Sequence, residues 1–189
     1  MTGKSTKSKT LNELRSEFLQ LREQIAEAQA DRPPEPVKDY VFAGIDGPVR
    51  LSELFAQKSE LFVIHNMGTN CAYCTLWADG FNGVLQHLSN RAAVVVSSPD
   101  AVEVQQQFRA DRHWQLDMVS TSDNQFARDM GYQNDRGYHP GVSVFSNAKN
   151  QLTRVADTPF GPGDDYCAVW HLFDLLPDGA NAWQPKFSY

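Results

Sequence analysis

The chain has 189 residues, of which 41% are hydrophobic and 11% aromatic, and its formal net charge is −6. This apolar content is sufficient for a buried core and excludes an intrinsically disordered chain. The acidic balance argues against nucleic acid as the main partner, because phosphate contacts need clustered lysine and arginine side chains. It argues more weakly against an anionic membrane.

The sequence carries no sign of export or of a membrane span. No stretch reaches the roughly 18 apolar residues that a membrane helix needs. The basic, polar residues 1–10 are not followed by the apolar run of a secretory signal. Three cysteines in a chain of this size do not make a disulfide scaffold, so we expect a reducing, cytoplasmic location.

An amphipathic helix is predicted near the N-terminus, because apolar side chains recur there at spacings of three and four residues. Its narrow apolar seam consists of Leu11, Leu14, Phe18, Leu21, Ile25 and Ala28. We expect the seam to pack on its own domain or on a second subunit, the latter giving a homodimer through this helix. A free coiled coil is less favoured, because it needs three to four sustained heptads and the seam barely spans three.

Prolines within residues 32–36 end this helix, because proline lacks an N–H group and disfavours helix in the residue before it. We therefore expect residues 1–36 to form an N-terminal tail, an amphipathic helix and a proline-rich linker. Residues 37–189 are expected to form the main domain.

The first half of the main domain alternates between strand and helix signals. These predict a strand, a tight turn, a helical turn, a buried strand, a helix and a valine-rich strand, at residues 39–42, 46–47, 51–55, 60–67, 75–89 and 91–97. Ser98 and Pro99 then suit the cap and the first position of a helix that runs to about residue 112.

The second half continues the alternation. It predicts a strand, a helix capped by Ser122, a polar loop, two strands and a last helix, at residues 116–120, 122–131, 133–139, 141–145, 152–156 and 165–176. Asn147 and Asn150 mark the turn between the last two strands. Alternating β–α–β units closed by a hairpin and a helix imply an α/β fold, with helices on both faces of a mixed central sheet.

The most informative motif is Cys71-Ala72-Tyr73-Cys74, which lies between an apolar run and a helical stripe. A sulfur at a helix N-terminus faces unpaired backbone N–H groups and the positive end of the helix dipole, so its thiolate is favoured. The thiolate is the form that attacks disulfides and peroxides, and such sites lower a cysteine pKa from about 8.5 to between about 3.5 and 7.5. The spacing also lets the second sulfur attack a mixed disulfide formed by the first, which indicates dithiol chemistry.

Three other interpretations of this pair are less favoured. A structural zinc site needs four ligands and usually two such pairs, whereas Cys167 is the only further cysteine and the histidines are scattered. A c-type haem needs a histidine directly after the second cysteine, where this chain has Thr75. The third is burial of both thiols without chemistry. We therefore expect no metal and no cofactor.

Residues 38–178 resemble the thioredoxin superfamily. The resemblance rests on a strand, the two cysteines, a helix and a distant proline that opens a strand. The lead-in from residue 42 is similar to the peroxiredoxin-like and cytochrome-maturation branches. Hallmarks of a bacterial thioredoxin-like family of unknown function, predicted to be dithiol–disulfide oxidoreductases, lie at residues 77–81, 141–145 and 170–177. The resemblance implies a thioredoxin-like fold of the peroxiredoxin-like variant, with an extra N-terminal helix.

The resemblance also implies roles for five residues. Cys71 would be the attacking thiolate, and Cys74 would resolve the mixed disulfide. Pro140 would match the cis-proline beside the active site, which leaves the preceding backbone free to pair with a substrate peptide. His65 stands where thioredoxins place a buried carboxylate, so it is either a proton carrier for the second cysteine or a core histidine. His139 is expected to flank the sulfurs and, when protonated, to favour the thiolate.

We therefore predict a thiol–disulfide oxidoreductase that acts on a protein or a small-molecule thiol or disulfide. A thiol peroxidase is one alternative, although peroxiredoxins place threonine three residues before the reactive cysteine, where this chain has Gly68. A non-catalytic thioredoxin-like interaction module is another. Cys167 is expected to be a packing residue rather than a third redox thiol, because its neighbours in the last helix are apolar.

Overall fold

A computed structural model describes residues 8–148 and 151–189, and the chain divides into two compact units between Pro33 and Pro34. Residues 1–7 of the expected tail and Asn150 of the expected turn lie outside the described residues. The first unit holds helix α1 (Leu11–Ala30), which confirms the predicted amphipathic helix. Thr10 begins it with a reciprocal cap: its hydroxyl accepts the Glu13 N–H, and the Glu13 carboxylate accepts the Thr10 N–H.

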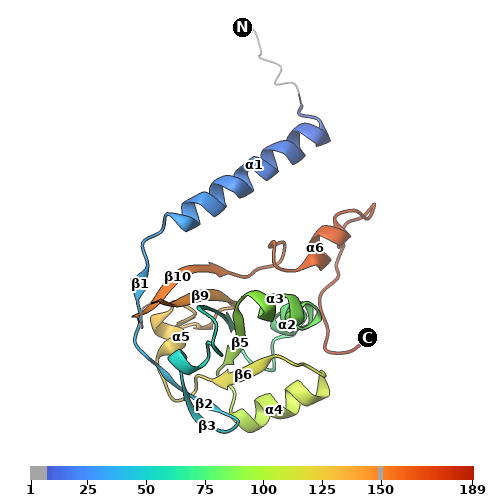
Figure 1. The fold of residues 1–189 in the computed structure, drawn as a ribbon. Coiled ribbons are helices and arrows are strands. Elements are labelled where there is room, and N and C mark those ends of the chain that lie inside the picture. The colour runs from blue at the N-terminus through green and yellow to red at the C-terminus, as the bar shows by residue number, and fades with distance from the viewer. Residues whose placement is uncertain (1–7, 149–150) are drawn as a thin grey trace. The chain divides into compact units, whose positions relative to one another are not determined.

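The second unit is built on a large mixed sheet (Figure 1). Within the described residues its strands lie in the order β1-β10-β9-β4-β5-β6-β2-β3. Their bounds are β1 Glu35–Pro36, β2 Val41–Gly44, β3 Gly47–Arg50, β4 Glu60–His65, β5 Ala93–Ser98, β6 Asp117–Ser120, β9 Gly141–Ala148 and β10 Gln151–Pro159. Strand β4 pairs in parallel with β5, and β5 with β6, whereas β9 joins β4 in antiparallel fashion.

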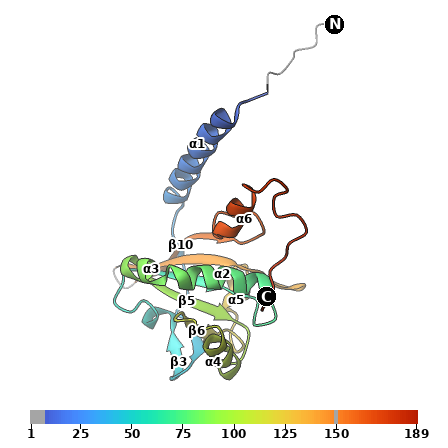
Figure 2. The ribbon, with the colours of Figure 1, turned by 90° about the vertical axis from the view of Figure 1, so that its right-hand side faces the viewer.

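Helices cover both faces of this sheet, as the sequence predicts. They are a 3₁₀ turn η1 Leu51–Glu53, α2 Ala72–Gly83, α3 Leu85–Arg91, α4 Val102–Asp111, α5 Phe126–Asp129 and α6 Ala168–Phe173. Figure 2 shows α3 and α2 in line along the sheet. Side chains of β4 alternate between two cores, since Leu61 and Val63 pack with Phe126 of α5 whereas Ile64 packs with Trp77 of α2. Helices α2 and α5 therefore lie on opposite faces.

Two of the predicted helix starts are wrong. Ser98 belongs to β5, where its hydroxyl accepts the Asp100 N–H instead of capping a helix, and α4 begins further along the chain. Ser122 does not begin a helix either, because α5 is a single turn whose first N–H, that of Phe126, is accepted by the Asn124 side chain. In both places local side-chain hydrogen bonds stabilise a turn in competition with the helix.

Other boundaries also differ from the sequence prediction. The helix expected at 75–89 begins at Ala72 and divides at Val84 into α2 and α3. Gly83 stands at this break, and glycine costs a helix about 1 kcal/mol relative to alanine. The polar loop at 133–139 contains a short hairpin of β7 (Gln133–Asn134) and β8 (Gly137–Tyr138).

The expected linker contributes a strand to the sheet, since β1 pairs with β10. Pro36 fits there because an edge strand tolerates a residue without an N–H group. None of the helices in the described part of the chain is both long and apolar enough to cross a membrane.

Candidate active site

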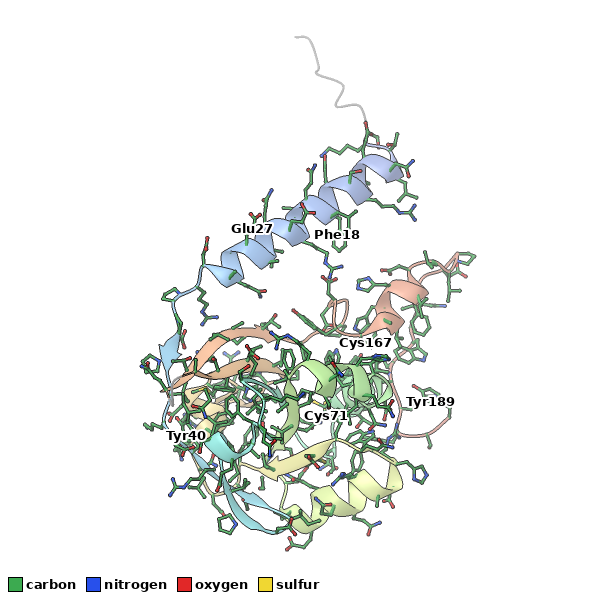
Figure 3. The ribbon with its side chains drawn as sticks, viewed as in Figure 1. Phe18, Glu27, Tyr40, Cys71, Cys167 and Tyr189 are labelled. Carbon is green, nitrogen blue, oxygen red and sulfur yellow. The ribbon has the colours of Figure 1, made fainter. Side chains whose placement is uncertain are left out.

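The two neighbouring cysteines lie at the end of the sheet, where β4 leads into α2. Strand β4 ends at His65, and Cys71 is the residue that caps α2. Strand β9 begins at the same end, because Gly141 is the partner of His65 in the ladder. The loop that carries Cys71 and the segment that carries Pro140 therefore leave the sheet together. Figure 3 labels Cys71 in this region.

Cys71 occupies the capping position of a helix, which usually holds serine, threonine, aspartate or asparagine. Its sulfur accepts the Cys74 backbone N–H at 3.1 Å. The Cys74 thiol donates to the same sulfur, and these bonds, with a further one from the Tyr73 N–H, outweigh partial burial and lower the pKa of Cys71 to about 7. Because the side chain is only half-buried, its thiolate remains within reach of a substrate.

Cys74 has the opposite environment. Its side chain is 3% exposed, and its sulfur accepts the Met67 N–H at 3.4 Å. The hydrogen bond to Cys71 and the burial of the thiol raise the pKa of Cys74. Both residues are free thiols. The pair thus combines an accessible, acidic thiol with a sheltered thiol that stays protonated, which is the division of labour needed for attack and resolution.

The loop that delivers Cys71 is held by side chains that sequence reasoning missed. Asn66 Oδ1 accepts the Gly68 N–H at 2.8 Å, and Asp100 Oδ2 accepts the Thr69 N–H at 2.7 Å. Gly68 has φ +109°, and a Cβ there would lie 3.1 Å from both Asp100 carboxylate oxygens. Any other residue at position 68 would therefore be strained, which favours glycine there. One sequence signal could have revealed the role of Asp100: it follows β5, which runs parallel to β4, and the loops that follow parallel strands meet at one edge of the sheet.

His65 lies on the other side of β4 from the thiols. It is 4% exposed, its Nε2 lies 2.9 Å from Ser143 Oγ, and its ring stacks on Tyr132 with centroids 3.8 Å apart. Burial, with a smaller contribution from Arg154, lowers the pKa of His65 to about 3, so the imidazole is neutral. Among the described contacts none joins His65 to either cysteine. This geometry is that of a stacked core histidine.

The expected cis bond before Pro140 is wrong. The described residues contain no cis peptide bond, so this bond is trans, the isomer that X–Pro bonds favour by about 0.5–1 kcal/mol. The trans backbone is well satisfied here, since the His139 N–H donates to Tyr132 O at 2.8 Å and Pro140 O accepts the Phe160 N–H at 2.9 Å. His139 itself is exposed, and none of the contacts described for the chain joins its ring to a sulfur.

Cys167 lies just before α6 (Figure 3). It belongs to a buried cluster with Trp77 and Trp170. Burial raises the pKa of its thiol, which makes it a poor nucleophile. Tyr73, between the two neighbouring cysteines, stacks on Trp170 with ring centroids 6.2 Å apart. Cys167 is thus placed as a packing residue, and the aromatic side chains around it form one wall beside the turn that carries Cys71.

The described residues offer no set of side chains arranged to bind a metal ion. Among residues 8–148 and 151–189, no group of three or more His, Cys, Asp or Glu side chains is placed to hold a metal ion.

Comparison with known proteins gives one family match. A family model described as "Bacterial protein of unknown function (DUF899)" matches residues 5–188. None of the curated proteins matches the chain.

The fold is similar to that of several peroxiredoxins. The Xanthomonas campestris bacterioferritin comigratory protein, which has alkyl peroxide reduction activity, is 16% identical with a TM-score of 0.56, over 64% of this chain and 80% of that one. Peroxidoxin BcpB from Mycobacterium tuberculosis is 20% identical with a TM-score of 0.56, over 64% and 82%. A cysteine mutant of PrxQ from Xylella fastidiosa is 15% identical with a TM-score of 0.59, over 70% and 89%. The predicted thioredoxin-like fold of the peroxiredoxin-like variant is therefore confirmed.

Proposed function

The chain belongs to the family described as "Bacterial protein of unknown function (DUF899)", and we propose that it works as a thiol–disulfide oxidoreductase of the cytoplasm. One observation carries the proposal. Cys71 caps α2 with a lowered pKa, and the sheltered thiol of Cys74 is hydrogen-bonded to it. The substrate class is a protein or a small-molecule disulfide, which the dithiol form reduces.

The proposed reaction has two exchange steps. The Cys71 thiolate attacks one sulfur of the target disulfide, so a Cys71–target disulfide forms and the other target sulfur leaves as a thiolate. Cys74 then loses its proton and attacks the Cys71 sulfur, which forms the Cys71–Cys74 disulfide and releases the second target thiolate. Two electrons pass from the protein to the target. The Cys74 proton goes to one target thiolate, and the other target thiolate takes from solvent the proton that Cys71 released when it ionised. A protein or small-molecule thiol donor restores the dithiol by the reverse exchange.

An insulin-reduction assay with a thiol donor tests this proposal. We expect Cys71→Ser to abolish turnover, because no nucleophile remains at the helix cap. Cys74→Ser should retain a single capture step and accumulate a mixed disulfide on Cys71. Cys167→Ser is the matched control and should reduce insulin at the wild-type rate. Equal rates for wild type and Cys71→Ser would reject the proposal and favour a non-catalytic interaction module.

A thiol peroxidase is the second candidate, and the likeness of the fold to peroxiredoxins is the observation that favours it. Arg154 and Arg128 are the arginines that could activate a peroxide, but both have other partners. Arg154 bonds to Glu35 at 2.6 Å and to Met130 O at 2.9 Å, and Arg128 lies 3.4 Å from Asp135. Consumption of hydrogen peroxide by the wild type, with a thiol donor and in the absence of insulin, would favour this candidate if it depended on Cys71.

A further inference from the structure

Helix α1 carries an apolar seam that its own unit cannot cover. The described part of the first unit holds no other helix or strand, and α1 has no buried residue. Leu14 and Leu21 of the seam are 49% and 55% exposed. Most of the stability of a helix in a protein comes from packing of its apolar face, so the seam calls for a partner.

The width of the seam indicates what kind of partner it fits. Numbered as heptads with Leu11 at position a, the helix places apolar residues at every a and d position, namely Leu11, Leu14, Phe18, Leu21, Ile25 and Ala28. The flanking e and g positions are all polar or charged, namely Thr10, Arg15, Glu17, Arg22, Gln24 and Gln29. A helix that packs on a globular core usually has a wider stripe that includes e or g, whereas a strict a/d stripe is a coiled-coil seam.

The flanking charges indicate a second copy in parallel orientation. In a parallel pair each g position faces the e position of the next heptad on the partner, so Glu17 of one helix meets Arg22 of the other. An antiparallel pair would bring e positions together, where Arg15 and Arg22 would repel each other. Within one helix Glu17 bonds to Lys9, and Arg22 lies over the Phe18 ring, so pairing would replace these contacts by contacts between the two helices.

We propose that α1 pairs in parallel with α1 of a second copy, so that the chain forms a homodimer through a short left-handed coiled coil. The seam spans barely three heptads, which is short for a coiled coil and makes a weak, dissociating dimer the expected result. The reciprocal cap of Thr10 and Glu13 supports it by fixing the start of the helix. The inference stands apart from the redox function, because it involves no residue of the Cys71 site.

Sedimentation velocity of the full chain over a range of concentrations tests the dimer. We expect a dimer that dissociates on dilution, and we expect the double variant Leu14→Ser/Leu21→Ser to weaken association by about a hundredfold or more, because four buried leucines are lost per dimer. Leu19→Ser is the matched control: Leu19 is 59% exposed and lies at a b position away from the seam, so its association should be unchanged. A wild type that is monomeric at every concentration, or a dimer indifferent to the double variant, would overturn the proposal.

Charge exchange tests the parallel orientation separately. Glu17→Arg should weaken the dimer, because the new guanidinium group of one copy would face Arg22 of the other, and the added change Arg22→Glu should restore it. These surface changes leave the fold of the second unit intact, which the alkylation rate of Cys71 can verify. Failure of the second change to restore association would show that the helices do not pair in this register.

Discussion

The lowered pKa of Cys71 depends mainly on the hydrogen bonds that Cys74 donates to its sulfur. The Cys74 thiol and the Cys74 backbone N–H both donate to the Cys71 sulfur, and both bonds favour the thiolate. The same hydrogen bond raises the pKa of Cys74, because a thiol that donates its proton to a neighbouring sulfur holds that proton more tightly. Two chemically identical side chains are therefore separated in pKa by their positions in one helical turn.

This coupling predicts a pH profile. We expect the alkylation rate of Cys71 by iodoacetamide to rise with pH to a plateau, with a midpoint at the pKa of about 7, since the thiolate is lost as pH falls through that value. Cys74→Ala removes the thiol donor, so the midpoint should move up toward the ordinary thiol value of about 8.5. Cys74→Ser keeps a hydroxyl donor and should stay nearer the wild-type midpoint.

The rates are best measured in a Cys167→Ser background, so that one reactive cysteine is followed in the Cys74 variants. A midpoint that is the same with alanine and with serine at position 74 would show that the thiol bond does not control Cys71.

The limits of sequence reasoning at the scale of residues are clear at His65 and Pro140. The resemblance left His65 open as a proton carrier or a core histidine, and the side-chain alternation of β4 decides between them by turning the ring toward Tyr132. The spacing in the sequence could not show to which face of the sheet the His65 side chain points, because that depends on the register and the exact end of β4. The prediction of a cis bond before Pro140 came from the resemblance alone. The trans backbone is held by hydrogen bonds to Tyr132 and Phe160, which the local sequence around Pro140 does not reveal.

At the scale of elements, the cysteine-bearing start of α2 could be predicted because its signals are local. An apolar run, two closely spaced cysteines and a helical stripe follow one another within the sequence. The support of the preceding loop could not be predicted in the same way. Asp100 reaches Thr69 across two parallel strands, so the contact exists only after β4 and β5 have paired.

The loop leads to a prediction on stability. Gly68→Ala should lower the free energy of unfolding by about 1–3 kcal/mol, because the new Cβ meets the Asp100 carboxylate at a positive φ. Gly80→Ala is the control within α2, where a Cβ meets nothing within 4 Å. It should raise the stability by about 0.5–1 kcal/mol, as alanine does in a helix interior. Urea unfolding measures both, and a Gly68→Ala variant as stable as Gly80→Ala would contradict the account of the loop.

At the scale of the whole molecule, the mixed sheet with helices on both faces could be predicted from the alternation of strand and helix signals. The variant of the fold came from the resemblance, and the similar peroxiredoxin structures bear it out. The alternation of strand and helix signals did not predict β1, the strand at one edge of the sheet. Strand β1 is only two residues long and contains Pro36, so its pairing with β10 carries no periodic signal.

The central claim is that Cys71 and Cys74 exchange two electrons as one unit, and a redox titration against glutathione with mass detection tests it directly. We expect a single two-electron transition from the dithiol to a Cys71–Cys74 disulfide, with Cys167 a free thiol throughout. A midpoint below the cytosolic glutathione potential is the result that fits the proposed reduction of target disulfides. A pair that stays reduced at every ratio, or a glutathione adduct on Cys71 that Cys74 never displaces, would contradict the account.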